Sequence, residues 1–552
     1  MRSSTSIALL LCCLAGGTAQ GLRQQQRLDD DIHLTYDEDI SCPPGPKEGW
    51  PHSEPFQTTP DEQLRYNQAL DEEFYLQNRE FMLSLQRDRK ERSSGNLLEE
   101  GIRIRQTHIA SPQGSTTRYY TGVTHFSHVN DPNLVTLLFS AGRHDGGSNT
   151  YLTIDISDQG AMTNPFAAAQ ETFLDEEDVS TYTWVSSYTQ KDIEDGSVLH
   201  WALFSGGNGR GVVGPSKLYV FEEDSNGNLR EPQLIWVEEY TQRGGARYCL
   251  LADLGDIYDG DKLVSKKGSF DILISGTGGL DIYSSYVGND WQRIRTLSLV
   301  NEATDSNPTG AVSFLGVMPT QDRYLVISSR ARWALAREKK FPNAPSLVYD
   351  YQEDVVVQEF SSGGQTVSVA LLDDQSQILL GAGGQADMSG QPNLLYEITS
   401  TDKSDVAIEL SDVQLLKGTS TMYVPFESVD PYPVSSSEFF SIPRSGITKT
   451  RQVKSFSLLD SSAEIILEVN SAETCNLYYR ENESVHASTI LPLPGSQGHM
   501  SEVYGGVYAR GGDILEVGDQ VFIVFANYNG NNTVYSFDSR WLRGVDISLA
   551  EE

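Results

Sequence analysis

The chain has few cysteines, and its positive charges are far outnumbered by negative ones. Only five of its 552 residues are cysteine, and Cys12 and Cys13 lie in the first apolar stretch. The remaining Cys42, Cys249 and Cys475 allow at most one disulfide, so disulfides are not the main source of stability. Acidic residues outnumber basic ones by 76 to 41, which gives a formal net charge of −35. This charge disfavours binding to nucleic acid or anionic membranes through bulk electrostatics and favours the attraction of cations.

Long apolar segments are lacking as well. No stretch is apolar over the roughly 20 residues of a membrane-spanning helix, so we predict no transmembrane segment. A positive charge near the start, the apolar run Ile7–Leu14 and the small residues Gly17 to Ala19 predict a secretory signal over residues 1–19. We therefore expect a secreted or extracellular protein. The sequons at Asn482 and Asn531 are candidate glycosylation sites on such a route.

Familiar catalytic motifs are absent from the sequence. It contains neither a Gly-x-Ser-x-Gly nucleophile motif nor a His-Glu-x-x-His zinc motif. The nine histidines are scattered. His125 and His128 lie three apart and would face opposite sides of a strand. Such histidines are typical of turns and surfaces rather than of a metal site.

Two glycine runs resemble phosphate loops, but strands rather than helices follow them. A phosphate loop needs a helix whose N-terminus faces the anion. The runs after Gly142 and Gly206 therefore predict tight turns. If these turns line the mouth of a ring, Arg143, His144 and Arg210 are candidate contacts for an acidic or sugar ligand.

The N-terminal part differs in composition from the rest. Residues 20–59 are polar and contain a proline cluster, which predicts a linker or a propeptide. Residues 60–92 carry apolar side chains at helical spacing and predict an amphipathic helix. That helix either packs against the main domain or engages a partner or a second copy.

Short strands separated by turns fill residues 117–545. Seven copies of a strand, a glycine-rich or polar turn and a second strand recur there, beginning at Leu134, Leu199, Phe270, Tyr324, Gln377, Glu464 and Gln520. Each copy has room for about four strands, as a propeller blade needs. We predict an all-β fold, a seven-bladed β-propeller with an N-terminal helical extension. Two β-sandwiches would explain the same strands less economically.

One acidic, glycine-punctuated loop precedes the third copy. It contains Asp253, Asp256, Asp259 and Asp261, and Asp271 begins the strand that follows. Ca²⁺ takes six to eight oxygen ligands, mostly carboxylates and carbonyls. The middle three would converge if the loop wraps, whereas Asp271 would either join them or fix the loop by accepting hydrogen bonds. The alternative is a solvated acidic hairpin without a metal.

This segment resembles the FG-GAP and VCBS-type repeats of integrin-alpha-like propellers. The resemblance rests on the acidic loop followed by the apolar strand Phe270–Gly276, and it is weaker in the other copies. It implies structural Ca²⁺ held by the five aspartates, and a role in adhesion or matrix contact. Residues 262–269 are an insertion relative to the more compact pattern of the family.

These observations lead to one main functional hypothesis. We expect a secreted, non-catalytic propeller that binds an extracellular glycan or protein and is stabilised by Ca²⁺. A secreted polysaccharide hydrolase or lyase that uses the propeller mouth is the first alternative. An assembly component that engages a partner through the helix at 60–92 is the second. The sequence does not determine the oligomeric state.

Overall fold

The computed structural model describes the chain between residues 105 and 538, with gaps, the longest of which span residues 299–310, 331–345, 383–393, 411–449 and 494–508. The predicted signal, linker and helix at 1–19, 20–59 and 60–92 lie outside this part. The described residues form an all-β structure and contain no helix. In this part of the chain, therefore, no helix is long and apolar enough to span a membrane.

The strands are arranged in seven antiparallel sheets of four within the described ranges. The first three sheets, in chain order, comprise β2 (Tyr120–Ser127), β3 (Leu134–Ala141), β4 (Thr150–Asp155) and β5 (Thr172–Phe173); β6 (Tyr182–Lys191), β7 (Val198–Gly206), β10 (Ser216–Glu223) and β11 (Gln233–Glu238); and β12 (Ala246–Ala252), β15 (Asp271–Gly276), β16 (Gly279–Ser284) and β17 (Gln292–Ser298). The next three comprise β18 (Ala311–Val317), β19 (Tyr324–Arg330), β20 (Ser346–Asp350) and β21 (Val355–Phe360); β22 (Thr366–Leu371), β23 (Gln377–Ala382), β24 (Leu394–Asp402) and β25 (Asp405–Leu410); and β26 (Thr450–Ser457), β27 (Ala463–Asn470), β28 (Cys475–Glu481) and β29 (Ser484–Leu493). Two short hairpins, β8 (Asn208–Gly209) with β9 (Val212–Val213) and β13 (Ile257–Asp259) with β14 (Lys262–Ser265), lie between strands of these sheets.

The last sheet joins the two ends of the described chain. It contains β30 (Ala509–Val517), β31 (Gln520–Asn527) and β32 (Thr533–Asp538), and its outermost strand is β1 (Arg105–His108). β1 pairs antiparallel with β32, from Arg105 opposite Ser536 to His108 opposite Thr533. The predicted span of 117–545 begins after this strand. Because β1 pairs with β32, strands from both ends of the described chain share one sheet. No sheet edge is therefore left unpaired where the two ends meet.

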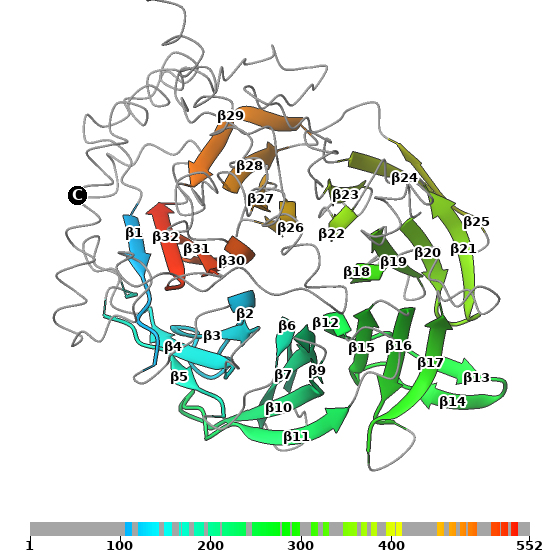
Figure 1. Ribbon diagram of the computed structural model, residues 1–552, viewed down its shortest axis with the longest axis horizontal. Coiled ribbons are helices and arrows are strands. Elements are labelled where there is room, and N and C mark those ends of the chain that lie inside the picture. The colour runs from blue at the N-terminus through cyan, green and yellow to red at the C-terminus, as the bar shows by residue number, and fades with distance from the viewer. Residues whose placement is uncertain are drawn as a thin grey trace, which may run out of the picture.

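The seven sheets form a ring, as Figure 1 shows. Their innermost strands contact one another in the order β2, β6, β12, β18, β22, β26 and β30, and β30 returns to contact β2. Each predicted strand–turn–strand copy corresponds to the second and third strands of one sheet, as for β3 and β4 or β31 and β32. A ring of radially arranged four-stranded sheets is a β-propeller.

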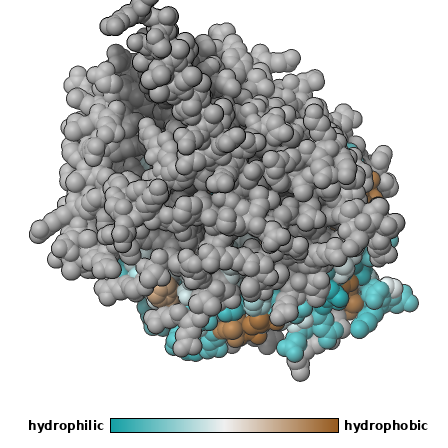
Figure 2. All heavy atoms as spheres, in the orientation of Figure 1, coloured by the Kyte–Doolittle hydropathy of each residue, from teal (hydrophilic) through white to brown (hydrophobic). Residues whose placement is uncertain are grey.

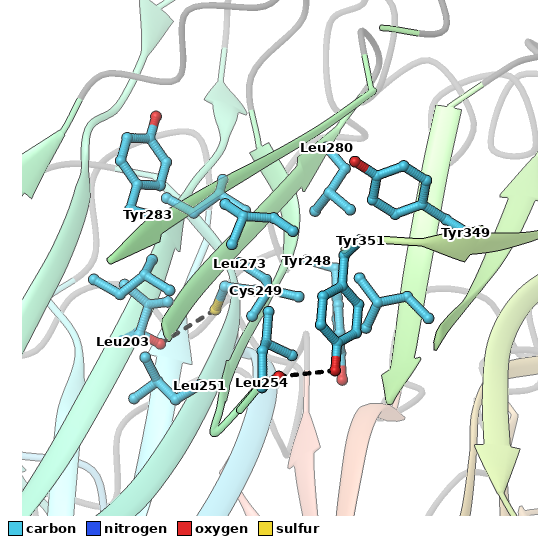
Figure 3. Close-up of a cluster of buried hydrophobic side chains, with 14 of the residues drawn as sticks. Leu203, Tyr248, Cys249, Leu251, Leu254, Leu273, Leu280, Tyr283, Tyr349 and Tyr351 are labelled. Carbon is cyan, nitrogen blue, oxygen red and sulfur yellow. Dashed lines mark hydrogen bonds between the residues drawn. The ribbon is translucent and has the colours of Figure 1, made fainter. Parts of the chain in front are cut away.

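The hydrophobic core lies between neighbouring sheets rather than at one centre. Phe126, Phe204 and Phe221 are buried together between the first and second sheets. A larger cluster joins the second, third and fourth sheets, and Figure 3 shows part of it around Leu273 and Tyr351. Because each sheet buries both faces against its neighbours, no single sheet is a stable unit by itself.

Two cysteines contribute to this core. Cys249 and Cys475 are both buried, and neither forms a disulfide bond. The Cys249 thiol donates to the carbonyl oxygen of Leu203 at 3.3 Å (Figure 3), and burial raises its pKa to about 12. This thiol is therefore protonated and packs as a small apolar side chain.

Some apolar side chains remain on the outer rim. Leu234, Ile235 and Val237 of β11 are each close to half exposed. Figure 2 shows this patch as brown surface at the lower rim of the molecule. β11 is the outermost strand of its sheet, so its apolar residues have no neighbouring strand of that sheet to cover them.

Candidate functional site

The predicted Ca²⁺ loop is an ordered hairpin between β12 and β15. Its two strands, β13 and β14, pair antiparallel across a turn that contains Asp259, Gly260 and Asp261. Gly260 has a φ of 61°, a backbone conformation that glycine adopts without a steric penalty. Both turn aspartates are exposed to solvent.

Two further carboxylates of the loop accept hydrogen bonds from its own backbone. Asp253 accepts from the N–H groups of Gly255 and Gly268, at 2.9 and 2.8 Å. Asp256 accepts from the N–H of Lys267 at 2.8 Å. These bonds tie both sides of the hairpin together at its base.

Asp271 lies deeper, at the start of β15, and is fully buried. The Ser265 hydroxyl contacts both of its carboxylate oxygens at 2.9 Å. Burial raises the pKa of Asp271 to about 7, although hydrogen bonds from Ser265, Ser284 and the Leu254 backbone oppose the shift. Among the residues that the structure describes, no cation contacts this carboxyl group, so burial is not offset by an opposite charge and the group titrates near neutral pH.

The carbonyl groups of the loop are bonded to the next sheet. The Leu254 carbonyl accepts from the Tyr351 hydroxyl at 2.9 Å (Figure 3), and the Asp256 carbonyl accepts from the Gln352 amide at 3.2 Å. Arg295 of β17, in the same sheet as the hairpin's flanking strands, donates to the carbonyl of Tyr258 at 2.6 Å. Protein donors thus occupy many of the oxygens that a cation would need.

The five aspartates consequently do not form a ready cation site in this arrangement. Nowhere in the described residues do three or more His, Cys, Asp or Glu side chains come together as a metal site needs. A Ca²⁺ ion at this hairpin would compete with the hydrogen bonds that already hold Asp253 and Asp256. Ca²⁺ binding here stays a prediction of the sequence, without added support from the geometry.

A different charged cluster lies near the centre of the ring. Asp513 of β30 contacts Lys454 of β26 and, at 2.7 Å, Nδ1 of His125 of β2. We call these three residues the axial triad, because the innermost strands of three consecutive sheets carry them (Figure 1). The Asp513 side chain is fully buried, whereas those of His125 and Lys454 are 22% and 32% exposed.

The charge state of the axial triad follows from these contacts. Burial alone would raise the pKa of Asp513, but Lys454 and His125 lower it to about 2. The carboxylate is therefore ionised and only accepts hydrogen bonds. Nδ1 of His125 must then carry a proton and donate to it.

Further hydrogen bonds fix the strands that carry the axial triad. The Gly512 N–H donates to the Gln452 side chain at 2.8 Å, across β30 and β26. The Ser187 hydroxyl of β6 donates to the carbonyl of His125 at 2.8 Å. The first bond fixes β30, which carries Asp513, to β26, and the second fixes β2, which carries His125, to β6.

A second histidine cluster is fully buried and has no exposed member. His200 contacts Glu223 at 2.6 Å, and burial lowers the pKa of His200 despite this contact. Glu223 also accepts from the backbone N–H groups of Val129 and Asn130, at 2.9 and 2.5 Å. This cluster fixes the loop after β2 to the second sheet, which is a structural role.

The predicted sequon at Asn531 lies within a buried network that joins the first and last sheets. The Glu171 carboxylate accepts from Tyr120, Thr150 and Asn532, at 2.5, 2.7 and 2.8 Å. Asn531 itself is only 4% exposed. A glycan would therefore need this region to open, and glycosylation at Asn531 stays a prediction that the folded geometry disfavours.

Four other predicted residues lie outside the described part of the chain. They are Arg143, His144, Arg210 and Asn482. The structure instead brings together His125, Lys454 and Asp513, of which only His125 stands out in the sequence. Asp513 has one sequence signal, because it is the only charged residue in the run Gly511–Leu515. Its partners lie 388 and 59 residues away, which no local motif reveals.

The ring of four-stranded sheets, with charged groups at its centre, defines the class of the protein as a β-propeller. No protein-family model matches the chain, and no curated protein matches it in sequence. Solved structures with a similar course include Sqt1 of Chaetomium thermophilum, at 12% identity and a TM-score of 0.43, over 77% of this chain and 96% of that one. The periplasmic gluconolactonase PpgL of Pseudomonas aeruginosa is similar at 12% identity and a TM-score of 0.40, over 73% and 96%. Similarities this distant carry no functional argument, so the class rests on the arrangement of the sheets.

Proposed function

We propose that this chain is a secreted, seven-bladed propeller that binds an extracellular glycan or protein without catalysis. The seven described sheets would be its complete set of blades, which the unbroken cycle of contacts between innermost strands supports. Secretion and the extracellular setting follow from the predicted signal at residues 1–19. The charge of −35 fits a soluble protein of that setting.

One observation carries the binding role: two partly exposed polar groups are held at the ring centre by a buried carboxylate. Asp513 accepts from both Lys454 and His125, so neither side chain is free to rotate away. Fixed donors bind a ligand at a lower entropic cost than mobile ones. The axial triad is therefore the proposed binding site.

A glycan array and a screen of extracellular proteins test this proposal, with wild-type protein beside Lys454→Gln. We expect a ligand that wild type binds and that the variant binds at least about tenfold more weakly, a loss of about 1.4 kcal/mol. Equal binding by both proteins would exclude the axial triad as the site. Turnover of any bound polysaccharide would overturn the non-catalytic role.

The polysaccharide hydrolase or lyase has one observation in its favour. His125, oriented by an ionised aspartate, has the arrangement of a general base. Release of reducing ends or unsaturated products from a polysaccharide, abolished in His125→Asn, would establish this alternative.

A further inference from the structure

We propose that β11, on the outer rim of the second sheet, pairs with an extended peptide segment of another protein, whose middle is apolar and whose ends carry lysine or arginine. The segment would add a further strand to the sheet, a mode of recognition known as strand addition. β11 is the outermost strand of its sheet, whereas the axial triad lies on innermost strands. The inference therefore concerns a second surface and goes beyond the proposed function.

One edge of β11 has no strand beside it. Within the described ranges, β10 is the only strand that pairs with β11. The backbone N–H and C=O groups that point away from β10 are the groups with which an added strand bonds. The strand itself is held in place, because Trp236 is buried and its ring centroid lies 5.3 Å from that of Tyr283 in the third sheet. β11 thus offers a fixed template on its open side.

The exposed apolar side chains of β11 lie together. Leu234, Ile235 and Val237 are between 45% and 47% exposed. They belong to the brown patch on the lower rim in Figure 2. An edge strand with such side chains is prone to pair with other chains, so soluble proteins usually protect it with charge or cover it. A partner segment would provide that cover.

Two other outer strands differ from β11 in ways that matter for pairing. β17 contains a bulge at Ile294, as β11 does at Ile235, but it exposes the charged Arg293. A charge of this kind protects an edge. β21 exposes valines, but it contacts β25 of the fifth sheet (Figure 1). β11 therefore combines apolar side chains with an open edge.

The two ends of β11 are acidic, and this selects the partner. Glu231 is exposed just before the strand, and Glu238 is its last residue. Two neighbouring basic side chains are already paired with carboxylates: Arg230 with Glu222 at 2.7 Å, and Lys217 of β10 with Asp175 at 3.6 Å. A basic residue at each end of the incoming segment would complement the acidic ends.

The same charges disfavour a second copy of this chain as the partner. In an antiparallel pair of β11 strands centred between Leu234 and Ile235, Glu231 of each copy would lie opposite Glu238 of the other. Like charges directly opposite each other destabilise a strand pair. A segment of a different protein with basic ends avoids this repulsion.

Fluorescence anisotropy with the full chain and labelled synthetic peptides tests the inference. The peptides are about eight residues long, within the usual range for strands, with valine, isoleucine or tyrosine alternating with threonine and with lysine at both ends. A matched set carries glutamate at both ends. We expect lysine-ended peptides to bind wild type, and their glutamate-ended counterparts to bind about threefold or more weakly. Raised salt should reduce this difference.

Backbone methylation distinguishes strand pairing from general apolar contact. The tightest peptide is made in two versions, one N-methylated at alternate residues and the other at the intervening residues. Because an added strand bonds through the N–H groups of one edge only, one version should bind about tenfold or more weakly and the other should keep its affinity. Equal affinities of the two versions would overturn strand pairing.

Variants assign the binding to β11. Ile235→Lys places a charge on the edge and should weaken the lysine-ended peptides about tenfold or more. Glu231→Lys should weaken them by about threefold and strengthen the glutamate-ended ones. Val355→Lys, at a similarly exposed position of β21, is the matched control and should bind as wild type does. A melting curve for each variant verifies that it folds.

The remaining outcomes also decide the inference. Failure of every lysine-ended peptide to bind wild type would overturn it, as would an equal loss in Val355→Lys and Ile235→Lys. A concentration-dependent dimer of wild type in sedimentation, abolished in Ile235→Lys, would show that a second copy occupies the edge instead. None of these results touches the axial triad, whose test is ligand binding by Lys454→Gln.

Discussion

Two carboxylates of this propeller are fully buried, yet their surroundings have opposite effects on their charge. Asp513 in the axial triad contacts Lys454 and His125, and its pKa falls to about 2. Asp271 at the base of the acidic hairpin has serine and backbone donors and, within the described ranges, no cation beside it, and its pKa rises to about 7. The two side chains are similarly buried, so the difference between their pKa values comes from the groups that contact each carboxylate. Clustered acidic residues in sequence therefore do not indicate where a buried negative charge is stabilised.

Replacement of Asp513 should have the largest effect on stability. Asp513→Asn removes the charge that both Lys454 and His125 face, and breaking a buried ion pair in this way costs about 3 kcal/mol. Urea unfolding at neutral pH measures the loss. Asp261→Asn, on the exposed hairpin turn, is the control and should change stability by less than about 0.5 kcal/mol. Equal losses in both variants would remove the distinction between the two regions.

Replacement of Glu171 should have the next largest effect. Its carboxylate accepts three hydrogen bonds from residues of the first and last sheets, so Glu171→Gln leaves buried donors poorly paired and should cost about 2 kcal/mol. Glu222→Gln breaks only a surface pair with Arg230 and serves as the control. If both variants unfold at the same urea concentration, the Glu171 network does not hold the two sheets together.

A smaller effect is expected where the hairpin contacts the fourth sheet. Tyr351→Phe removes the buried hydroxyl that donates to the Leu254 carbonyl, a loss of about 1 kcal/mol. Tyr258→Phe is the matched control, because Tyr258 is 51% exposed. An unchanged unfolding midpoint for Tyr351→Phe would mean that this bond does not help hold the hairpin in place.

The smallest effect is expected from Ca²⁺. Because protein donors already occupy the carboxylates of Asp253, Asp256 and Asp271, added Ca²⁺ should shift the melting temperature little. A thermal melt with Ca²⁺, with EDTA and with neither measures this directly. A saturable rise that EDTA reverses, and that Asp256→Asn abolishes, would instead establish the metal site that the acidic spacing predicts.

The sequence was informative about repeated elements and uninformative about contacts between them. Each repeated pair, such as Leu134–Ala141 with Thr150–Asp155, carries its own pattern of apolar residues and turn residues, so both strands were predictable. β1 was missed because four residues at 105–108 have no repeat partner nearby and become a strand only by pairing with β32. The axial triad was missed for the same reason, since ring closure brings His125 to Asp513.

The spacing of the acidic residues could not reveal which groups their oxygens contact in the fold. Asp253, Asp256 and Asp261 look equivalent in sequence. In the fold, the first two accept backbone hydrogen bonds and the third is exposed at a turn. Those roles depend on donors from residues 255–268 and from the next sheet, whose positions only the folded chain defines.

The most direct test is the pH dependence of unfolding free energy for wild type, Asp513→Asn and Asp271→Asn. A lowered pKa stabilises the folded state above the unfolded-state value near 3.8, so the loss in Asp513→Asn should be fully present above about pH 4.5 and should fade as pH falls toward about 2. A raised pKa has the opposite sign: wild type should lose the contribution of Asp271 as pH rises from about 4 to about 7. Relative to wild type, Asp271→Asn should therefore become steadily more stable over that interval. If both variants show the same pH dependence, the two buried carboxylates do not differ as described.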